Sequence, residues 1–452
     1  MNGTKQPATA VDLHHADVLP TIVREQRKSI LLRFWIVAGI FYMALPGTLL
    51  GFTNLMAISA GHGLTTLPAA WMEGHGHAQM FGWIGSFVLG IGFYSQPART
   101  SGALLRQFIT FLLWTPAVAL RWFANIYEWH WRLLLPTSAG LEFVAILLFL
   151  WSASQHKLPE ESRPSSRKPR MELWMISVLT GTMGLAAGVV FNFVECLRLG
   201  LYGTTPSFPH ALDQRYLVLL GWGFLAPMVW GFSARWFHAF LAIPKPDDLR
   251  FRAALILNLA GVICGLAAQA LAATVLIACG AFAIALAMRV GSKASGPAKV
   301  IGIHPSFSFF ARVPYLWLMI AAGMSIWAAL NDQHGGIWGA SRHALTVGFA
   351  ATMVFAIGPR ILPHFVGVRA LFSKQLMFVS LLLLQAGCTL RVSSEPLAYE
   401  GIYSMAWKTL PVSGMLELGG VLVFALNMGL TVLTGSSTFF QATTGTQASP
   451  TA

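Results

Sequence analysis

Residues 133–153 read LLLPTSAGLEFVAILLFLWSA, an apolar run in which Glu142 carries the single charge. The hydrocarbon core of a membrane accommodates about 20 such residues as one helix. Eleven further runs of this kind predict a chain that crosses a membrane about twelve times, an all-α integral membrane protein. The predicted spans are 30–51, 76–95, 104–121, 133–153, 172–194, 213–233, 251–270, 273–289, 312–330, 343–361, 374–391 and 411–434.

The composition agrees with this prediction. Hydrophobic residues make up 55% of the 452 and charged residues 10%, whereas about a quarter of the residues in soluble domains are charged. The formal net charge is +13, but the basic residues flank the apolar runs, so they indicate topology and no nucleic acid is expected as a partner. The four cysteines lack any CxxC spacing, which favours buried small side chains over a zinc or disulfide framework.

The basic residues also predict the orientation of the chain. With the N-terminus in the cytoplasm, 23 of the 30 Lys and Arg residues fall on the cytoplasmic side and 7 outside. A bias of this kind sets orientation, so both termini are predicted to be cytoplasmic. We expect a cytoplasmic N-terminal tail over 1–29, one polytopic membrane domain over 30–434 and a disordered C-terminal tail over 435–452. If the seventh and eighth spans, divided near Ala270, were one helix, the C-terminus would lie outside.

Histidines gather at the predicted periplasmic ends of the spans. His75 and His77 open the second span, His210 precedes the sixth and His343 opens the tenth. Ionisable groups within a membrane are costly and mark functional sites, and imidazole is the commonest protein ligand of haem iron and copper. These four residues are therefore the candidates for a haem or copper site. The alternative is that they are interfacial histidines bonded to carbonyl groups.

Two of these segments repeat a pattern. Residues 77–83 (HAQMFGW) and 343–349 (HALTVGF) both begin with His-Ala and end with Gly and an aromatic residue, and the sixth span begins His210-Ala211. The second, sixth and tenth spans lie four apart, which favours three four-helix units around an axis. Residues i and i+2 of a helix are about 200° apart, so His75 and His77 are predicted to face different neighbours.

Other candidate residues have a functional and a purely structural interpretation. Glu142, Glu195 and Glu417 lie in or at the end of spans and fit either proton relay or packing. Arg235 fits a carboxylate or cofactor propionate as partner, or a side chain that extends to the cytoplasmic interface. Met80 fits a copper(I) ligand or a core side chain.

With these residues in view, the chain resembles the NnrS family of bacterial membrane proteins. That family has twelve predicted spans, a His-Ala-His-Glu-Met-Leu-Phe-Gly signature early and a His-Ala-Leu-Thr-Val-Gly signature late. Residues 75–82 (HGHAQMFG) match the first in both histidines and the Phe-Gly, and residues 343–348 (HALTVG) match the second throughout. The segment 231–235 (GFSAR) loosely matches a Gly-Gly-Arg segment. Ala78 and Gln79 depart from the family's Glu and Met.

The resemblance implies a haem- and copper-containing protein of the bacterial inner membrane, associated with nitric oxide and nitrosative-stress resistance. By it, His75, His77 and His343 become haem or copper ligands, and His210 and Arg235 cofactor contacts. The helix pattern is also similar to the catalytic subunit of haem–copper oxidases, although the copper-site histidines of the sixth and seventh spans are absent from the sequence. A haem-dependent oxidoreductase resembling nitric oxide reductase and a secondary transporter are the alternatives. The redox partner is not predicted.

Overall fold

In a computed structural model, residues 21–96, 100–155, 171–368 and 370–434 are described, and all regular elements among them are helices. Eleven of these helices are long and apolar enough to cross a membrane. The twelfth, residues 69–95, is equally long but more polar because it carries His75, His77 and Gln79. The predicted all-α membrane protein of about twelve spans is therefore confirmed.

Several spans consist of more than one helical segment. The first six are α2 (Thr21–Tyr42), η1 (Met43–Leu49) and α3 (Leu50–Gly61); α4 (Ala69–His77), η3 (Ala78–Gly85) and α5 (Ser86–Ser95); α6 (Ser101–Tyr127); α7 (Trp131–Ser154); α8 (Leu173–Tyr202); and α9 (His210–Val218), η5 (Leu219–Leu225) and α10 (Ala226–Phe240). The last six are α11 (Asp248–Leu266); α12 (Ala270–Ala287); α14 (Val313–Asn331), preceded by α13 (Phe307–Phe310); α15 (Gly336–His343), η6 (Ala344–Ala351) and α16 (Thr352–Phe365); α17 (Lys374–Tyr399); and α18 (Ala406–Thr434).

Several predicted boundaries need adjustment. The second and tenth spans begin at Ala69 and Gly336, so His75, His77 and His343 lie within these spans and do not open them. Helix α2 begins at Thr21, inside the tail predicted for 1–29, because its polar first turns pair among themselves, as Lys28 does with Glu25 at 3.7 Å. The seventh and eighth spans are separate helices, as predicted, since α11 ends at Leu266 and Ala268 adopts a left-handed φ of 61°. The predicted tail 435–452 lies outside the described residues.

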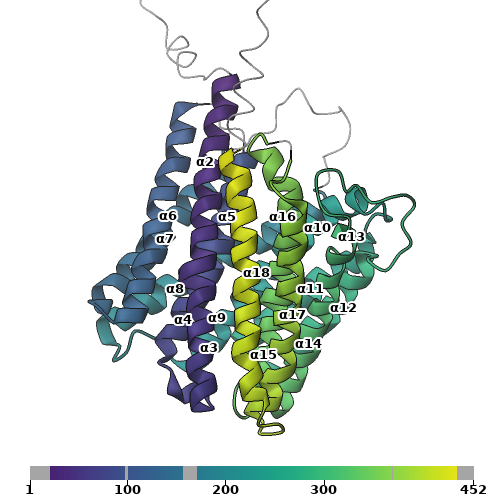
Figure 1. Cartoon of the computed structure of the whole chain (residues 1–452). Helices are drawn as coiled ribbons and strands as arrows, with labels where there is room; N and C mark the ends of the chain where they lie inside the picture. The colour runs from purple at the N-terminus through teal and green to yellow at the C-terminus, as the bar shows by residue number, and fades with distance from the viewer. Residues whose placement is uncertain (1–20, 97–99, 156–170, 369, 435–452) are drawn as a thin grey trace, which may run out of the picture.

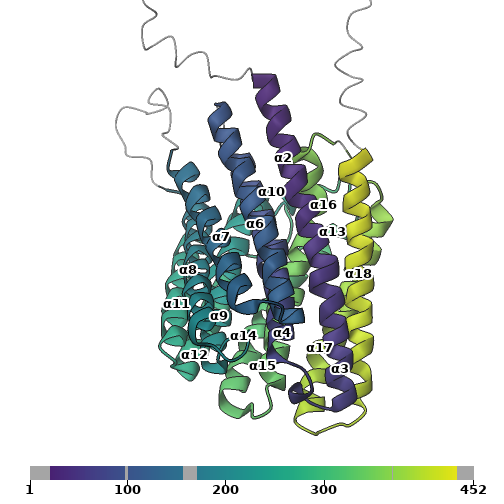
Figure 2. The same ribbon diagram turned by 90° about the vertical axis from the view of Figure 1, so that its left-hand side faces the viewer.

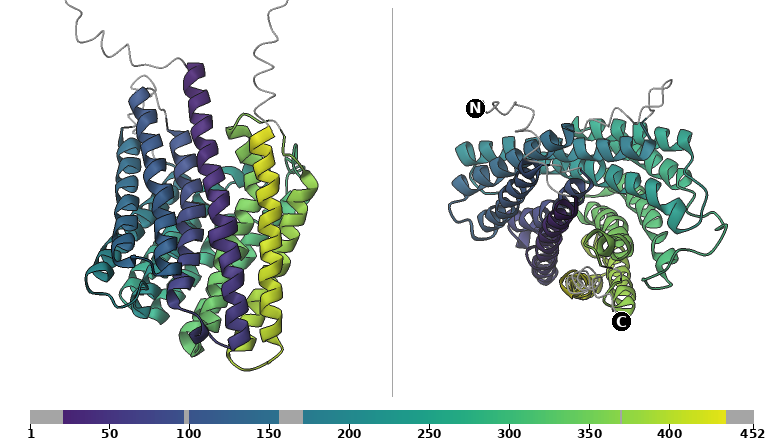
Figure 3. Two further views of the ribbon diagram at one scale, coloured as in Figure 1. Left: turned by 60° about the vertical axis from the view of Figure 1, so that its left-hand side comes forward. Right: turned by 90° about the horizontal axis from the view of Figure 1, so that it is seen from above.

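The first helix begins and the last helix ends at the same end of the bundle (Figure 1), as an even number of crossings requires. Figure 2 shows the same arrangement from the side, with α2 and α18 next to each other. The short helices α4, α9 and α15 all begin near the opposite end, which we call the histidine end. Seen along the bundle axis (Figure 3), the helices form a curved arrangement. We call the second, sixth and tenth spans the inner spans, because their central segments are almost entirely buried.

These three inner spans share a local structure. Each contains a π-helical turn, η3, η5 or η6, and the fifth and sixth residues of each turn are Gly and an aromatic residue: Gly82-Trp83, Gly223-Phe224 and Gly348-Phe349. π-Helical turns are rare and occur frequently at functional sites. The inner spans also contact one another, for example Trp83 with Phe355, whose ring centroids are 6.3 Å apart.

Each inner span belongs to a unit of four consecutive spans that ends in an antiparallel hairpin: α6–α7, α11–α12 or α17–α18. The three π-helical turns give the register of this repeat. The residues directly before them are His77, Val218 and His343. His210, predicted to be the counterpart of the two histidines, lies eight residues too early, because the His-Ala match ignored the position of the Gly-aromatic pair.

The predicted orientation can be tested with alkaline phosphatase, which is active only outside the cytoplasm. We expect fusions after Gly63 and Gly203, both at the histidine end, to be active. A fusion after Gly291, in the basic loop at the other end, should be inactive because Lys and Arg retain it in the cytoplasm. The opposite pattern at all three positions would invert the topology, and equal activity at Gly63 and Gly291 would contradict the number of spans between them.

Candidate functional site

His75 and His77 point toward different neighbours. The Nε2 atom of His77 lies 2.7 Å from Oε1 of Glu142 on α7. The Nδ1 atom of His75 lies 2.9 Å from the carbonyl oxygen of Gly47 in the π-helical turn η1. That turn contains Pro46, which has no N–H for a regular helical bond. The two imidazoles therefore belong to two separate sites, as their spacing along the helix predicts.

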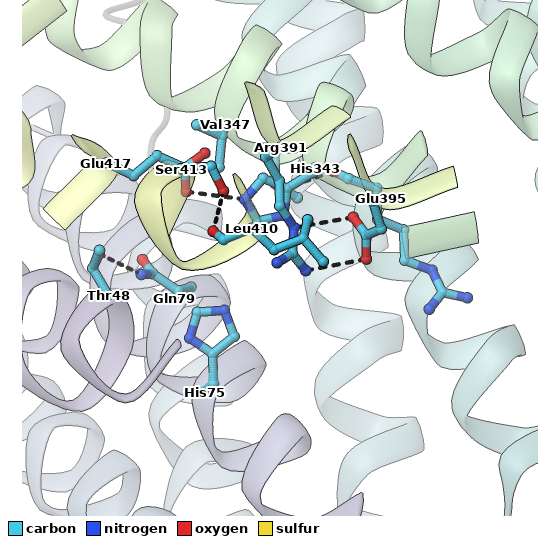
Figure 4. A network of polar contacts seen from close by, with 12 residues as sticks. Thr48, His75, Gln79, His343, Val347, Arg391, Glu395, Leu410, Ser413 and Glu417 are labelled. Atoms are coloured by element: carbon cyan, nitrogen blue, oxygen red, sulfur yellow. Dashed lines mark hydrogen bonds and ion pairs between the residues drawn. The ribbon is translucent and has the colours of Figure 1, made fainter. Parts of the chain in front are cut away.

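His75 faces His343 across the boundary between the third and first units (Figure 4). The Nε2 atom of His343 lies 3.1 Å from Oε2 of Glu417 on α18. Gly51 of α3 lies flat against the imidazole of His75, since a Cβ there would be 2.5 Å from Cε1 of the ring. We call the following residues the His343 site: His75, His343, Glu417, Gln79 and Arg391.

The His343 site holds polar groups that are only partly paired. Gln79 donates from Nε2 to Oγ1 of Thr48 at 2.9 Å, and Arg391 binds both carboxylate oxygens of Glu395, at 3.0 and 3.1 Å. Among the described residues no hydrogen-bond partner exists for three buried atoms here: Oε1 of Glu417, Oε1 of Gln79 and Nη1 of Arg391. Because leaving such atoms unpaired is costly, the site has capacity for a polar ligand.

The site around His77 is more fully paired. Glu142, whose side chain is completely buried, accepts from His77 through Oε1 and from Nδ2 of Asn192 through Oε2, at 2.9 Å. Arg121 donates to Oδ1 of Asn192 at 3.3 Å, to Sγ of Cys196, and to Oε2 of Glu73 at 3.2 Å. We call these residues the His77 network. It runs through four spans, and both of its carboxylates have two partners, since the backbone N–H of Phe208 also donates to Glu73.

The two sites are copies of one arrangement. Residues 135–142 (LPTSAGLE) and 410–417 (LPVSGMLE) share Leu-Pro, Ser, and Leu-Glu at identical spacing, and each ends in the glutamate that pairs with the inner histidine. Two glycines give the correspondence between the third and middle hairpins. Gly387 on α17 packs against Glu417 and the carbonyl of Ser413 on α18, and Gly261 on α11 packs in the same way against Ile277 and the carbonyl of Ala273 on α12. In the middle unit, therefore, Ile277 replaces the glutamate and Val218 the histidine.

The arginines of the first and third hairpins also correspond, but their carboxylates come from different helices. Arg121 on α6 pairs with Glu73, which lies four residues before His77 on α4. Four residues before His343 stands Gly339, where an added Cβ would lie 2.3 Å from the carboxylate of Glu395. Thus Glu395, on the same helix as Arg391, occupies the space that a glutamate at position 339 would fill.

The remaining predicted residues lie elsewhere. His210 is exposed at the start of α9. The side chain of Arg235 is 46% exposed, lies 4.3 Å above the ring of Trp174 and is 4.0 Å from the exposed carboxylate of Glu172, so it meets a carboxylate outside both histidine sites. Met80 is a core side chain and Glu195 pairs with Arg198 at 2.8 Å. The structure thus brings His75 and His343 together and assigns His77 to the neighbouring network, whereas His210 and Arg235 join neither.

Sequence reasoning singled out Glu142 and Glu417 but missed their pairing with the histidines. It missed Glu73, Arg121, Asn192, Arg391 and Glu395 altogether. The repeated LPxSxxLE pattern was a readable signal for both glutamates, because a repeat that matches between the fourth and twelfth spans implies a common role beside the second and tenth. Nothing comparable marks the arginines, since a single Arg near a span end is also a topology signal.

The donor set bears on which cofactor could fit. Within the described ranges no group of three or more His, Cys, Asp or Glu side chains is arranged to hold a metal ion. Haem iron needs only one or two protein ligands, because the macrocycle supplies the other four. Two imidazoles, each with one ring nitrogen engaged by a protein acceptor, match the way that ligating histidines are usually oriented. The two histidines of the His343 site therefore match the number of protein ligands that haem iron takes.

Comparison with known proteins adds a partial family match. The model of a family described as "Domain of unknown function (DUF8744)" matches residues 241–432. This region runs from the seventh span into the twelfth and includes His343 and Glu417, but it excludes His75 and His77. No curated protein matches the chain. The match therefore adds no activity to the geometry of the site.

Gly51 provides a test of the position of His75. Gly51→Ala should lower the free energy of unfolding by about 1–3 kcal/mol, because the new methyl group would overlap the imidazole. Gly76→Ala, on the same helix as His75, is the matched control, since nothing lies within 4 Å of an added Cβ. That control should be neutral or stabilising by about 0.5–1 kcal/mol. Thermal unfolding in detergent distinguishes the two, and equal effects would contradict the placement of His75.

Because Glu395 occupies the space of a glutamate at position 339, a glutamate introduced there is predicted to restore the stability lost when Glu395 is removed. Glu395→Ala should cost roughly 3 kcal/mol by leaving Arg391 without its partner. Adding Gly339→Glu should restore much of that loss, because a glutamate there has the position that Glu73 has beside Arg121. Glu400→Ala, which removes an exposed pair with His334, should have little effect. Failure of the double variant to exceed Glu395→Ala in thermal stability would contradict the proposed correspondence.

Proposed function

We propose that this chain is a haem-binding protein of the bacterial inner membrane, with His75 and His343 as the ligands of the haem iron, and that it handles nitric oxide or sustains resistance to it. The observation that carries the proposal is that these two imidazoles, from the second and tenth spans, lie in one region beside three unpaired buried polar atoms. The nitric oxide role rests on the resemblance of residues 75–82 and 343–348 to the NnrS signatures.

The hydrogen bonds of the two imidazoles support ligation. A metal-ligating histidine normally uses its second ring nitrogen to bond a carboxylate or carbonyl group, which fixes the ring and raises its basicity. Nδ1 of His75 bonds the carbonyl of Gly47 and leaves Nε2 available, while Nε2 of His343 bonds Glu417 and leaves Nδ1 available. Each histidine thus has one ring nitrogen engaged by the protein and one that could bind the haem iron.

The surrounding residues have separate tasks in this proposal. Gly51 keeps the wall behind His75 flat and so fixes the plane of its ring. Glu417 accepts from His343 and, with a side chain only 10% exposed, holds this histidine in one orientation. Arg391 donates to Glu395 through Nε and Nη2, and its Nη1 is available to donate to a ligand. When bound, haem would supply a one-electron redox centre that can also interact with nitric oxide.

The comparison between the two histidine sites supports placing the cofactor at His343. In the His77 network both oxygens of Glu142 and both oxygens of Glu73 are engaged by protein donors. At the His343 site one oxygen of Glu417 has no partner within the described chain. The carboxylates of the His77 network are thus fully paired by protein donors, whereas the carboxylate of Glu417 at the His343 site is not. The copper binding that the resemblance implies has no comparable support and remains a prediction.

A secondary transporter is the alternative that one observation favours. Arg121, 2% exposed, lies in the interior with Glu73 and Glu142. Buried charges of this kind mark ion or proton pathways in transporters. A reductase-like redox subunit is compatible with the same haem site and differs in needing an electron donor.

The test is an absorption spectrum, dithionite-reduced minus oxidised, of protein purified from haem-supplemented cells, together with metal analysis. We expect Soret and α bands that His75→Ala and His343→Ala each abolish or greatly reduce. His210→Ala is the matched control, because this exposed histidine joins neither site and should leave the haem content unchanged. A colourless, iron-free protein would overturn the proposal and leave the transporter as the better interpretation. Haem retained in both histidine variants would overturn the ligand assignment.

A further inference from the structure

Three buried polar atoms beneath the loop 203–209 have no hydrogen-bond partner among the residues that the structure describes. They are Nε of Arg121, Oδ1 of Asn125 and Oη of Tyr216. The residues that carry them are 2%, 0% and 7% exposed. Buried polar groups in proteins are almost always paired with protein atoms or with ordered water. Three unpaired atoms in one region therefore point to a ligand.

These atoms surround the same short segment. The guanidinium of Arg121 lies 5.0 Å from the ring of Phe208, and the ring centroid of Tyr216 lies 5.5 Å from that of Phe208. Asn125 donates to the carbonyl of Pro206 at 2.9 Å. Arg121 and Asn125 are four residues apart on α6, so they share one face of that helix. The unpaired atoms thus approach residues 206–208 from two spans.

The other side of this segment faces a hollow at the histidine end of the bundle. The hollow has a volume of about 270 Å³. Phe208 belongs to its lining and also contacts Arg121 and Tyr216, so it separates the hollow from the unpaired atoms by one side chain. The lining residues are Arg198, Leu199, Tyr202, Gly203, Thr204, Thr205, Ser207, Phe208 and Pro209.

The chemistry of the three atoms selects the ligand. Nε of Arg121 can only donate, Oδ1 of Asn125 can only accept, and the hydroxyl of Tyr216 can do either. A metal ion is excluded by the guanidinium, and an anion would find no partner in the amide oxygen. Water both donates and accepts, and two to four polar partners are what a buried water requires.

We propose that water enters at the hollow of loop 203–209 and binds at Arg121, Asn125 and Tyr216, which brings water into contact with the His77 network inside the membrane domain. The repeat of the fold is consistent with a special role for this place. Tyr216 stands three residues before Leu219, the first residue of the π-helical turn of the sixth span, as His75 stands three residues before Ala78 in the second. In our proposals, the boundary between the third and first units binds a cofactor, and the equivalent boundary between the first and second units binds water. The water site does not depend on haem binding.

The experiment is X-ray radiolytic footprinting of the purified full-length protein in H₂¹⁸O, read by mass spectrometry, because bound water generates hydroxyl radicals that oxidise adjacent side chains. Two pairs of buried residues serve as matched probes. Tyr216 is compared with Tyr42, whose hydroxyl donates to the carbonyl of Thr115. Cys196, bonded to Arg121, is compared with Cys388, and both cysteines are 0% exposed.

We expect Tyr216 and Cys196 to be oxidised several-fold faster than Tyr42 and Cys388, with incorporation of ¹⁸O. Equal rates within both pairs would overturn the water site. The route is tested with Thr205→Trp, which places a bulky ring in the hollow and should slow oxidation of Cys196 several-fold. Thr65→Trp, on another exposed loop at the same end, should not. Rapid oxidation that Thr205→Trp leaves unchanged would overturn entry through this hollow.

Discussion

The structure depends on the fact that a buried imidazole must be given a partner by the protein. The hydrocarbon of the bilayer offers no hydrogen-bonding partner, and an unpaired polar group there costs several kcal/mol. His77 and His343 each receive a glutamate from the fourth span of their own unit. This requirement links the inner span to the end of its hairpin, so the position of one glutamate restricts how four helices pack together.

The middle unit shows how the same fold exists without this pair. Val218 and Ile277 take the places of the histidine and the glutamate, and replacing both partners of a buried pair by apolar groups of similar shape can be nearly neutral. Apolar packing therefore suffices to hold an inner span against its hairpin. A pair that is dispensable for packing, yet present in two of three units, supports the view that the histidines serve a purpose beyond stability.

The spans could be predicted from the sequence because their signal is local. Twenty apolar residues predict a helix whatever lies beside it, and the separation of His75 and His77 follows from helical geometry alone. The pairing of His343 with Glu417 could not be predicted in this way, since it depends on the register between helices 74 residues apart. The His210 interpretation failed for a related reason. It used a two-residue match, whereas the π-helical turns that define the repeat are visible only in the structure.

The difference between the two histidine sites follows from the origin of one carboxylate. In the first unit Glu73 comes from the histidine-bearing helix itself and holds Arg121, whose other donors extend to Asn192 and so complete the shell around Glu142. In the third unit Glu395 comes from the helix of Arg391 and binds it through two parallel bonds, which leaves both Nη1 of Arg391 and Oε1 of Glu417 without a partner in the described chain. The origin of this one carboxylate thus decides whether the glutamate beside the inner histidine is fully paired by the protein, as Glu142 is, or retains an oxygen that a ligand can meet, as Glu417 does.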